Sequence, residues 1–124
     1  MCLIILNLWR FLMQIAHRSH RDADVIDITG QFNFGTRKDF STALEKVKQA
    51  GSTHVILNFK GVTFVDSAAI GLLALAAQQF KSTNRKLSLV GVQGTVKQIL
   101  NLAHIEQMIP TFASEDSAIG AKAA

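Results

Sequence analysis

The sequence is almost free of cysteine and proline, with one of each in 124 residues. A single cysteine, Cys2, cannot close an internal disulfide, and no Cys-x-x-Cys spacing exists for zinc or dithiol chemistry. A chain with a single cysteine and no internal disulfide fits a reducing compartment, and we expect a cytoplasmic protein. The lone Pro110 and the scattered glycines leave no linker or low-complexity segment, which favours a single domain.

Charge of one sign is not concentrated anywhere along the chain. The 13 basic and 9 acidic residues give a net charge of +4, but the closest basic runs are the pairs Arg37-Lys38 and Arg85-Lys86. Nucleic-acid-binding proteins gather basic charge on one face and interleave it with aromatic residues. We therefore expect solvated helix and turn surfaces, and no direct nucleic-acid partner.

Residues 1–12 form an apolar run in which Arg10 is the only charged residue. A membrane-spanning helix needs about 20 apolar residues, and a signal peptide carries its positive charge ahead of the apolar region. We therefore expect no transmembrane segment. Three explanations stay open for this extension: an interfacial anchor, a segment packed on the domain or a partner, and a native start at Met13. The domain itself is expected to span residues 13–124.

Hydrophobic spacing predicts that strands and helices alternate along the rest of the chain. The expected strands cover 13–18, 25–29, 54–57, 86–90 and 108–112, and the first two form a hairpin. The expected helices cover 36–50, 67–81, 96–103 and the residues after Ser114. Thr36 with Asp39 is expected to cap the first helix, and residues 58–65 are expected to form a loop. The order β-β-α-β-α-β-α-β-α predicts an α/β fold with a single mixed, mostly parallel sheet packed with helices.

The segment 67–81 is apolar on almost every side, so we expect a deeply packed helix there. Gly71 lies inside it, where glycine costs about 0.5–1 kcal/mol relative to alanine. We therefore expect another element to approach the backbone closely at Gly71.

Asp66 and Ser67 stand where the expected loop passes into this helix. As the N-cap, Asp66 can accept a hydrogen bond from the backbone N–H of Ala68 or Ala69. Ser67 then lies in the first turn, where free N–H groups and the helix dipole favour an anion. A phosphate on Ser67 would add about −1.5 to −2 charges at little cost to the domain. Spacing alone favours a plain capping pair, because Asp and Ser are common at helix starts.

Other polar clusters carry weaker signals. His17, His20, Asp22 and Asp24 resemble a metal cluster, but the strand period places His17 and His20 on opposite faces, so we expect no metal. Gly91 and Gly94 are weak markers of a phosphate contact, and no catalytic motif of the G-x-S-x-G or P-loop type occurs. We expect no catalytic residue, no cofactor and no enzyme.

The run Gly61-Val-Thr-Phe-Val-Asp-Ser-Ala-Ala-Ile-Gly-Leu72 resembles the signature of STAS domains, the family of bacterial anti-sigma factor antagonists. Ile28-Thr-Gly-Gln-Phe-Asn33 and Lys86-Leu-Ser-Leu-Val-Gly91 are similar to further segments of that family. The resemblance covers residues 13–119 and implies the STAS fold.

The resemblance also implies partner switching. In that family the unphosphorylated antagonist binds an anti-sigma factor that is also a serine kinase. The kinase phosphorylates the serine that matches Ser67, and a PP2C-type phosphatase reverses the reaction. The residues implied to contact the partner are Gln31, Phe32, Asn33, Asp66, Ala68 and Ala69. The oligomeric state stays open, with a weak homodimer as one alternative.

The sequence departs from the family pattern at two places. It has Asp-Ser-Ala-Ala where the family commonly has Asp-Ser-Ser-Gly, which leaves Ser67 as the only acceptor in the motif. Gln31 and Asn33 replace a glutamate and an aspartate, which removes two negative charges from the loop. The missing acids and the apolar N-terminus keep one alternative open, a soluble STAS accessory subunit of a membrane lipid or sulfate transporter. A second alternative is a nucleotide-binding regulatory domain that uses the strand–helix junctions.

Overall fold

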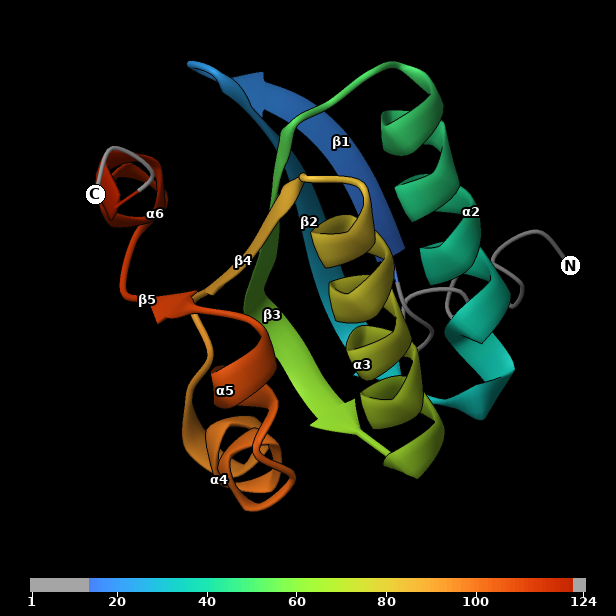
Figure 1. Cartoon of the computed structure of the whole chain (residues 1–124). Coiled ribbons are helices and arrows are strands. Elements are labelled where there is room, and N and C mark those ends of the chain that lie inside the picture. Colours follow the sequence, from blue (N-terminus) through green and yellow to red (C-terminus); the bar gives the residue numbers. More distant parts are fainter. Residues whose placement is uncertain (1–13, 122–124) are drawn as a thin grey trace, which may run out of the picture.

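The computed structural model describes residues 14–121, in which strands and helices alternate (Figure 1). The strands are β1 (Gln14–His20), β2 (Ala23–Phe32), β3 (His54–Val65), β4 (Lys86–Val90) and β5 (Thr111–Phe112). The helices are the 3-10 turn η1 (Phe34–Thr36), α2 (Arg37–Gln49), α3 (Ser67–Ser82), α4 (Gly94–Leu102), α5 (Ile105–Met108) and α6 (Glu115–Ala121). The expectations for residues 1–12, and for Met13 as the first strand residue, lie outside the described residues.

The strands form one sheet of five, in the order β1-β2-β3-β4-β5. β1 and β2 make an antiparallel hairpin, and each later pairing is parallel. Helices carry the chain back between the parallel strands, because such strands cannot be joined by a tight turn. The predicted α/β fold and its order of strands and helices are confirmed, with η1 and α5 as short additions.

The predicted loop at 58–65 is wrong, because β3 continues to Val65. Beyond Asn58 the strand pairs with β2 and no longer with β4, whose pairing ends at Asn58–Val90. Lys60 and Thr63 in this half are exposed. Because these exposed residues interrupt the apolar run, the sequence pattern predicts a strand that ends too early, at Leu57. The last predicted strand is also shorter than expected, since Met108 closes the helical turn α5.

The predicted cap of the first long helix is wrong as well. Thr36 makes no side-chain cap bond at α2. Its hydroxyl instead completes a capping box with Asn33 around η1, the additional turn that precedes α2. At the other end, Gly51 follows α2 with φ +87°, the left-handed conformation in which helices commonly end.

The expectation of an α3 helix packed on all sides is wrong. The helix buries one stripe, made of Ala69, Leu73, Ala76 and Phe80, whereas Leu75 is 50% exposed. Gly71 is exposed, and a Cβ built on it meets no atom within 4 Å, so the expected close approach is also absent there. No helix within residues 14–121 combines the length and apolarity needed to cross a bilayer.

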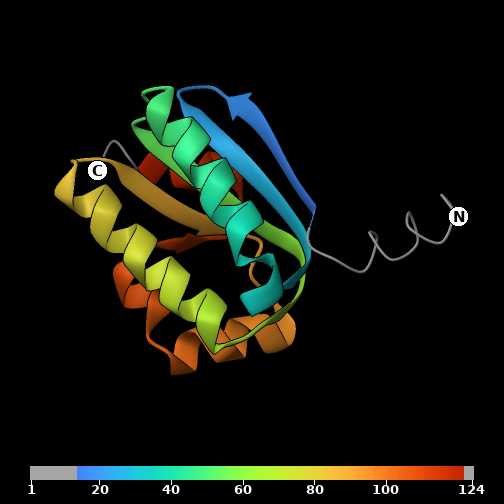
Figure 2. The same ribbon diagram turned by 90° about the vertical axis from the view of Figure 1, so that its right-hand side faces the viewer.

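The helices divide unevenly between the two faces of the sheet (Figures 1 and 2). α2, α3, α4 and α5 pack on one face, over a core that includes Phe32, Phe40 and Phe59. α6 lies against the other face, where Ala118 packs with Val25 and Ile56 in a smaller cluster. The larger core holds the ends of β2 and β3 and the start of α3 in fixed positions.

A polar network ties α6 to the hairpin on this second face. Arg18 Nε donates to Asp27 Oδ2 at 2.7 Å, and Arg18 Nη1 donates to Glu115 Oε1 at 2.9 Å. Asn58 Nδ2 donates to Asp27 Oδ1 at 2.7 Å. Burial raises the pKa of Asp27, but the hydrogen bonds from Arg18 and Asn58 outweigh it and hold that pKa below its ordinary value.

Replacing Asp27 by asparagine should lower the free energy of unfolding by about 1 kcal/mol at pH 7, because the charged acceptor is lost. A lowered carboxyl pKa in the folded state gives stability that is complete above the unfolded pKa of about 3.9 and is lost as pH falls through the folded value. The gap between wild type and D27N should therefore begin to narrow below about pH 4. Urea unfolding followed by circular dichroism across pH measures it.

Glu45→Gln is the matched control, because Glu45 pairs with Lys48 at 3.5 Å on the exposed side of α2. Its effect should stay below about 0.5 kcal/mol at pH 7. A D27N gap that persists unchanged at pH 3 would contradict the assignment of this stability to the ionised carboxyl.

Candidate functional site

The ends of β2 and β3 bring two distant segments of the chain together at one end of the molecule (Figure 1). Phe32 pairs with Val65 at the last step of the parallel register. The β2–η1 loop and the start of α3 therefore leave the sheet side by side, as the carboxyl ends of neighbouring parallel strands do in α/β folds.

The carboxylate of Asp66 connects these two segments directly. Its Oδ1 accepts a hydrogen bond from the Ala69 N–H at 2.9 Å, which caps α3. Its Oδ2 accepts one from the Phe34 N–H at 3.0 Å, across the gap to the other segment. The backbone N–H of Asp66 also donates to the carbonyl of Phe32 at 3.3 Å. One side chain thus caps α3 and holds the loop against it.

The loop has a second fixed point at Asn33. Asn33 Oδ1 accepts from the Thr36 N–H at 3.2 Å, while the Asn33 N–H donates to the Thr36 hydroxyl at 3.0 Å. The same hydroxyl donates to the carbonyl of Gln31 at 3.0 Å. Asparagine and aspartate serve about equally as helix N-caps. The Asn33 amide therefore fixes this loop in the way that a carboxylate at the same position could.

Ser67 is the first residue of α3 and is exposed to solvent. The first backbone N–H groups of a helix have no carbonyl partner within it. The Ala69 N–H donates to the Asp66 carboxylate. The N–H groups of Ser67 and Ala68 lie in the same first turn and have no acceptor within the helix. A phosphate on the Ser67 hydroxyl would meet the positive end of the helix dipole there.

Two exposed phenylalanines belong to the two segments that Asp66 holds together. Phe34, in the loop held by Asp66, is 60% exposed, and Phe64, near the end of β3, is 45% exposed. The guanidinium of Arg37 stacks on the Phe34 ring, 3.6 Å from its centroid, and its Nη1 donates to the Phe34 carbonyl at 2.6 Å. Gln31 pairs with Phe64 across the two strands. We call the surface formed by Gln31, Phe34, Phe64 and Ser67 the switch surface.

The structure brings the predicted site residues to one end of the fold, but their side chains differ in how far they are exposed to solvent. Gln31 and Ser67 are exposed, and Asn33, Asp66 and Ala68 are partly buried. The side chains of Phe32 and Ala69 are fully buried in the core, so these two support the surface from below and present no side chain to a partner.

Sequence reasoning missed Phe64 and Arg37 as members of this region. Strand alternation would place Phe64 on the same face as the buried Val62, but the register shift between Gly30 and Gln31 turns it outward, so Phe64 has no periodic signal in the sequence. Arg37 carries no sequence signal, because its position depends on the path of η1.

The other sequence clusters serve structural roles. His17 Nε2 contacts Asp24 at 2.9 Å and His20 Nε2 contacts Asp116 at 3.0 Å, so the two histidines have different partners. Gly91 has φ +75°, and a Cβ there would lie 3.0 Å from the backbone of Lys60, which explains the glycine by packing. Within residues 14–121 no group of three or more potential metal ligands occurs.

Comparison with known proteins identifies the chain's relatives. The family model described as the STAS domain matches residues 14–118. A STAS-domain containing protein of Pseudomonas aeruginosa (strain UCBPP-PA14) is 32% identical over 83 residues, which are 67% of this chain and 81% of that protein.

Solved structures share the fold at lower identity. An anti-sigma factor antagonist from Mycobacterium paratuberculosis has a TM-score of 0.81 at 15% identity, over 89% of this chain and 93% of that one. The Bacillus cell fate determinant SpoIIAA in its phosphorylated form has a TM-score of 0.64 at 19% identity, over 88% and 97%. A sulfate transporter family protein from Wolinella succinogenes has a TM-score of 0.69 at 19% identity, over 83% and 86%.

Removing the Asp66 carboxylate should destabilise the fold and release the loop. Asp66→Ala loses the α3 cap and the acceptor for Phe34, so we expect a drop of about 2 kcal/mol in the free energy of unfolding. Asp66→Asn is the matched control, because its single amide oxygen can keep the cap on the Ala69 N–H while its amide nitrogen cannot accept from the Phe34 N–H, so it should lose about half as much. Urea unfolding gives both values, and equal losses in the two variants would contradict the role assigned to the cap.

Substitution at Gly71 tests whether the glycine is needed for folding. Gly71→Ala should raise the free energy of unfolding by about 0.5–1 kcal/mol, because a Cβ meets only open space on an exposed helix face. Gly61→Ala is the contrasting variant and should destabilise, since its Cβ would lie 2.5 Å from Thr29 Cγ2. Thermal unfolding distinguishes the two, and a destabilised Gly71→Ala would contradict the open environment.

Proposed function

The chain belongs to the STAS domain family, and on that basis we propose that it is an anti-sigma factor antagonist, a non-enzymatic cytoplasmic protein that changes partners when Ser67 is phosphorylated. The unphosphorylated form binds an anti-sigma factor that is also a serine kinase. That kinase phosphorylates Ser67, and a PP2C-type phosphatase removes the phosphate.

One observation carries the proposal: an exposed serine opens a helix at the end of the fold that also carries two exposed aromatic side chains. Ser67 lies at the first position of α3, and Phe34 and Phe64 contribute apolar area to the same end of the fold. Apolar area of this kind favours protein contact over solvent. A hydroxyl within such a contact can be modified without disturbing the core.

The phosphate would act mainly on the partner. Within the domain it would be received by the first turn of α3, where the dipole favours a negative charge. In the complex it would place about −1.5 to −2 charges in an interface that buries Phe34 and Phe64. Desolvating those charges opposes binding, so release follows from the interface and needs no rearrangement of the domain.

The absence of acidic side chains from the loop 30–36 limits which kinases could dock on this surface. Gln31 and Asn33 leave no acidic side chain in the loop 30–36, and Arg37 stacks on Phe34 beside it. A partner that recognises an acidic loop would lose its charged contacts here. The proposed partner therefore docks on a neutral to basic, aromatic face.

A second candidate is an accessory subunit of a membrane transporter, and one observation favours it. The fold is shared with the sulfate transporter family protein from Wolinella succinogenes. In that case the switch surface would bind a transporter component in place of a kinase. Co-purification with an ABC-transporter ATPase and no kinase would support this candidate.

A nucleotide-binding role is a third proposal, for which a nucleotide-induced thermal shift is the test.

Affinity for the native partner should depend on the charge at residue 67. Protein carrying Ser67→Ala should be captured by the partner like wild type and should not be released by ATP. Ser67→Asp should bind at least tenfold more weakly, a loss of about 1.4 kcal/mol or more. The bait is pulled through native lysate, bound proteins are identified by mass spectrometry, and affinities follow by titration with the purified partner.

Ser41→Asp is the matched control, because Ser41 is exposed on α2, outside the switch surface, and it should leave the affinity unchanged. Intact-mass measurement before and after ATP should show one phosphate on wild type and none on Ser67→Ala. Unchanged affinity for Ser67→Asp would refute the switch.

A further inference from the structure

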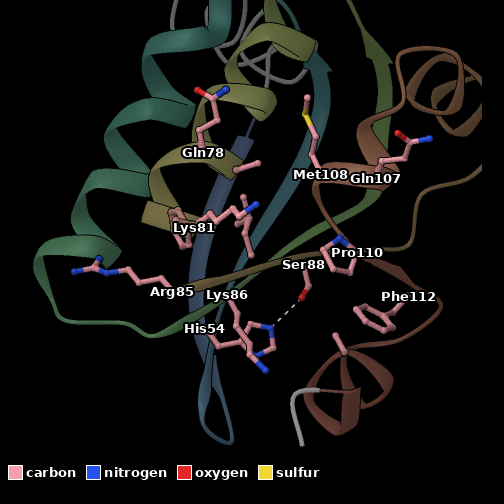
Figure 3. Close-up of a pocket in the computed structure, with 14 residues that line it drawn as sticks. His54, Gln78, Lys81, Arg85, Lys86, Ser88, Gln107, Met108, Pro110 and Phe112 are labelled. Carbon is pink, nitrogen blue, oxygen red and sulfur yellow. Dashed lines mark hydrogen bonds between the residues drawn. The ribbon is translucent and has the colours of Figure 1, made fainter. Parts of the chain in front are cut away.

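A groove of about 480 Å³ lies along the second half of α3, at the end of the helix away from Ser67 (Figure 3). The groove is bounded by α3 on one side and by the segment from α5 to β5 on the other. β4 forms its base. A volume of this size lies in the range of small-molecule sites in proteins.

The walls of the groove are mainly apolar. Ala77 and Phe80 line it from α3, Leu87 from β4, and Pro110 and Phe112 from the opposite segment. Met108, also in the lining, is 51% exposed and adds an apolar side chain at the opening. Such a surface favours a ligand with an apolar body.

The charged residues of the groove are all of one sign. Lys81, Arg85 and Lys86 line it. Lys81 and Lys86 are exposed, and the Arg85 guanidinium donates to the carbonyl of Lys48 at 3.0 Å. None of the described residues in the lining is acidic. A negatively charged group is therefore the complement of this opening.

Beneath the opening, His54 and Ser88 form a buried polar pair. His54 Nε2 and Ser88 Oγ are 3.0 Å apart, and the two residues are 1% and 4% exposed (Figure 3). The pair places polar atoms at the base of an otherwise apolar groove. A ligand headgroup could lie near this pair and the lysines while its apolar body lies toward Phe112.

The edge of β4 argues against an extended peptide as the occupant. β5 pairs with β4 at Leu89 and Val90, so within the described residues the stretch 86–88 has no strand partner on that side. A peptide that adds a strand gains its affinity from main-chain hydrogen bonds along an exposed edge. This stretch is too short to supply many of them, and the groove volume suits a small molecule better.

We infer that this groove binds a small amphipathic anion, a medium-chain carboxylate whose headgroup meets Lys81 and Lys86 and whose chain lies between α3 and the α5–β5 segment. The site is separate from the switch surface and does not depend on the function proposed for Ser67. No residue of the switch surface lines the groove.

Titration of the full chain with decanoate, followed by amide NMR, tests this inference. Decanoate should shift the amides of residues 77–88 and 107–112. It should bind at least tenfold more tightly than decanol, which has the same chain without the charge. Hexanoate, octanoate and decanoate should bind progressively more tightly, by up to about fourfold for each added CH₂ group. Ser67→Asp should bind decanoate like wild type.

The double variant Lys81→Gln/Lys86→Gln should weaken decanoate binding about tenfold. Lys97→Gln is the matched control, since Lys97 is exposed on α4 outside the groove. Ala77→Leu should weaken binding by filling the groove, and thermal unfolding checks that it folds. Equal affinities for decanoate and decanol, or shifts centred on Phe34 and Phe64, would overturn the inference. So would a lack of any decanoate binding, whether or not an acidic peptide binds at β4.

Discussion

The carboxylate of Asp66 is the constraint on which the site depends. Its two oxygens accept from two amides that are far apart in the sequence, Ala69 at 2.9 Å and Phe34 at 3.0 Å. The first bond begins α3 and so fixes Ser67. The second bond fixes the loop that carries Phe34. The register of β2 on β3 brings both amides within reach of one side chain, so the sheet determines the surface.

In this arrangement, the residues that hold the backbone in place are different from the residues that are exposed to solvent. Phe32 and Ala69 are buried and hold the backbone, while Phe34, Phe64 and Ser67 remain exposed. A charge added at Ser67 would therefore change the exposed surface without entering the core. The groove at the far end of α3 belongs to the same helix but shares no residue with the switch surface. One helix thus carries two chemically different surfaces, one near each end.

The sequence predicts those features that follow from local chemistry. Strand and helix alternation predicts the α/β order, and Asp66 before Ser67 predicts the N-cap, which the bond to Ala69 confirms. The bond from Phe34 to Asp66 depends on the sheet register and has no local signal. The same is true of the late half of β3, where exposed Lys60 and Thr63 interrupt the apolar run. Gly71 shows the opposite error, since an expected close approach proves to be open space.

The central claim is that phosphate at Ser67 changes a rigid surface by charge alone. Amide hydrogen exchange and NMR shifts of protein carrying phosphoserine at position 67 test it most directly, against the unmodified protein. We expect shift changes confined to the first turn of α3 and the loop 31–36, with the exchange protection of the Phe34 and Ala69 amides retained. Lost protection at those two amides, or shift changes spread through the core around Phe40 and Leu73, would contradict the account.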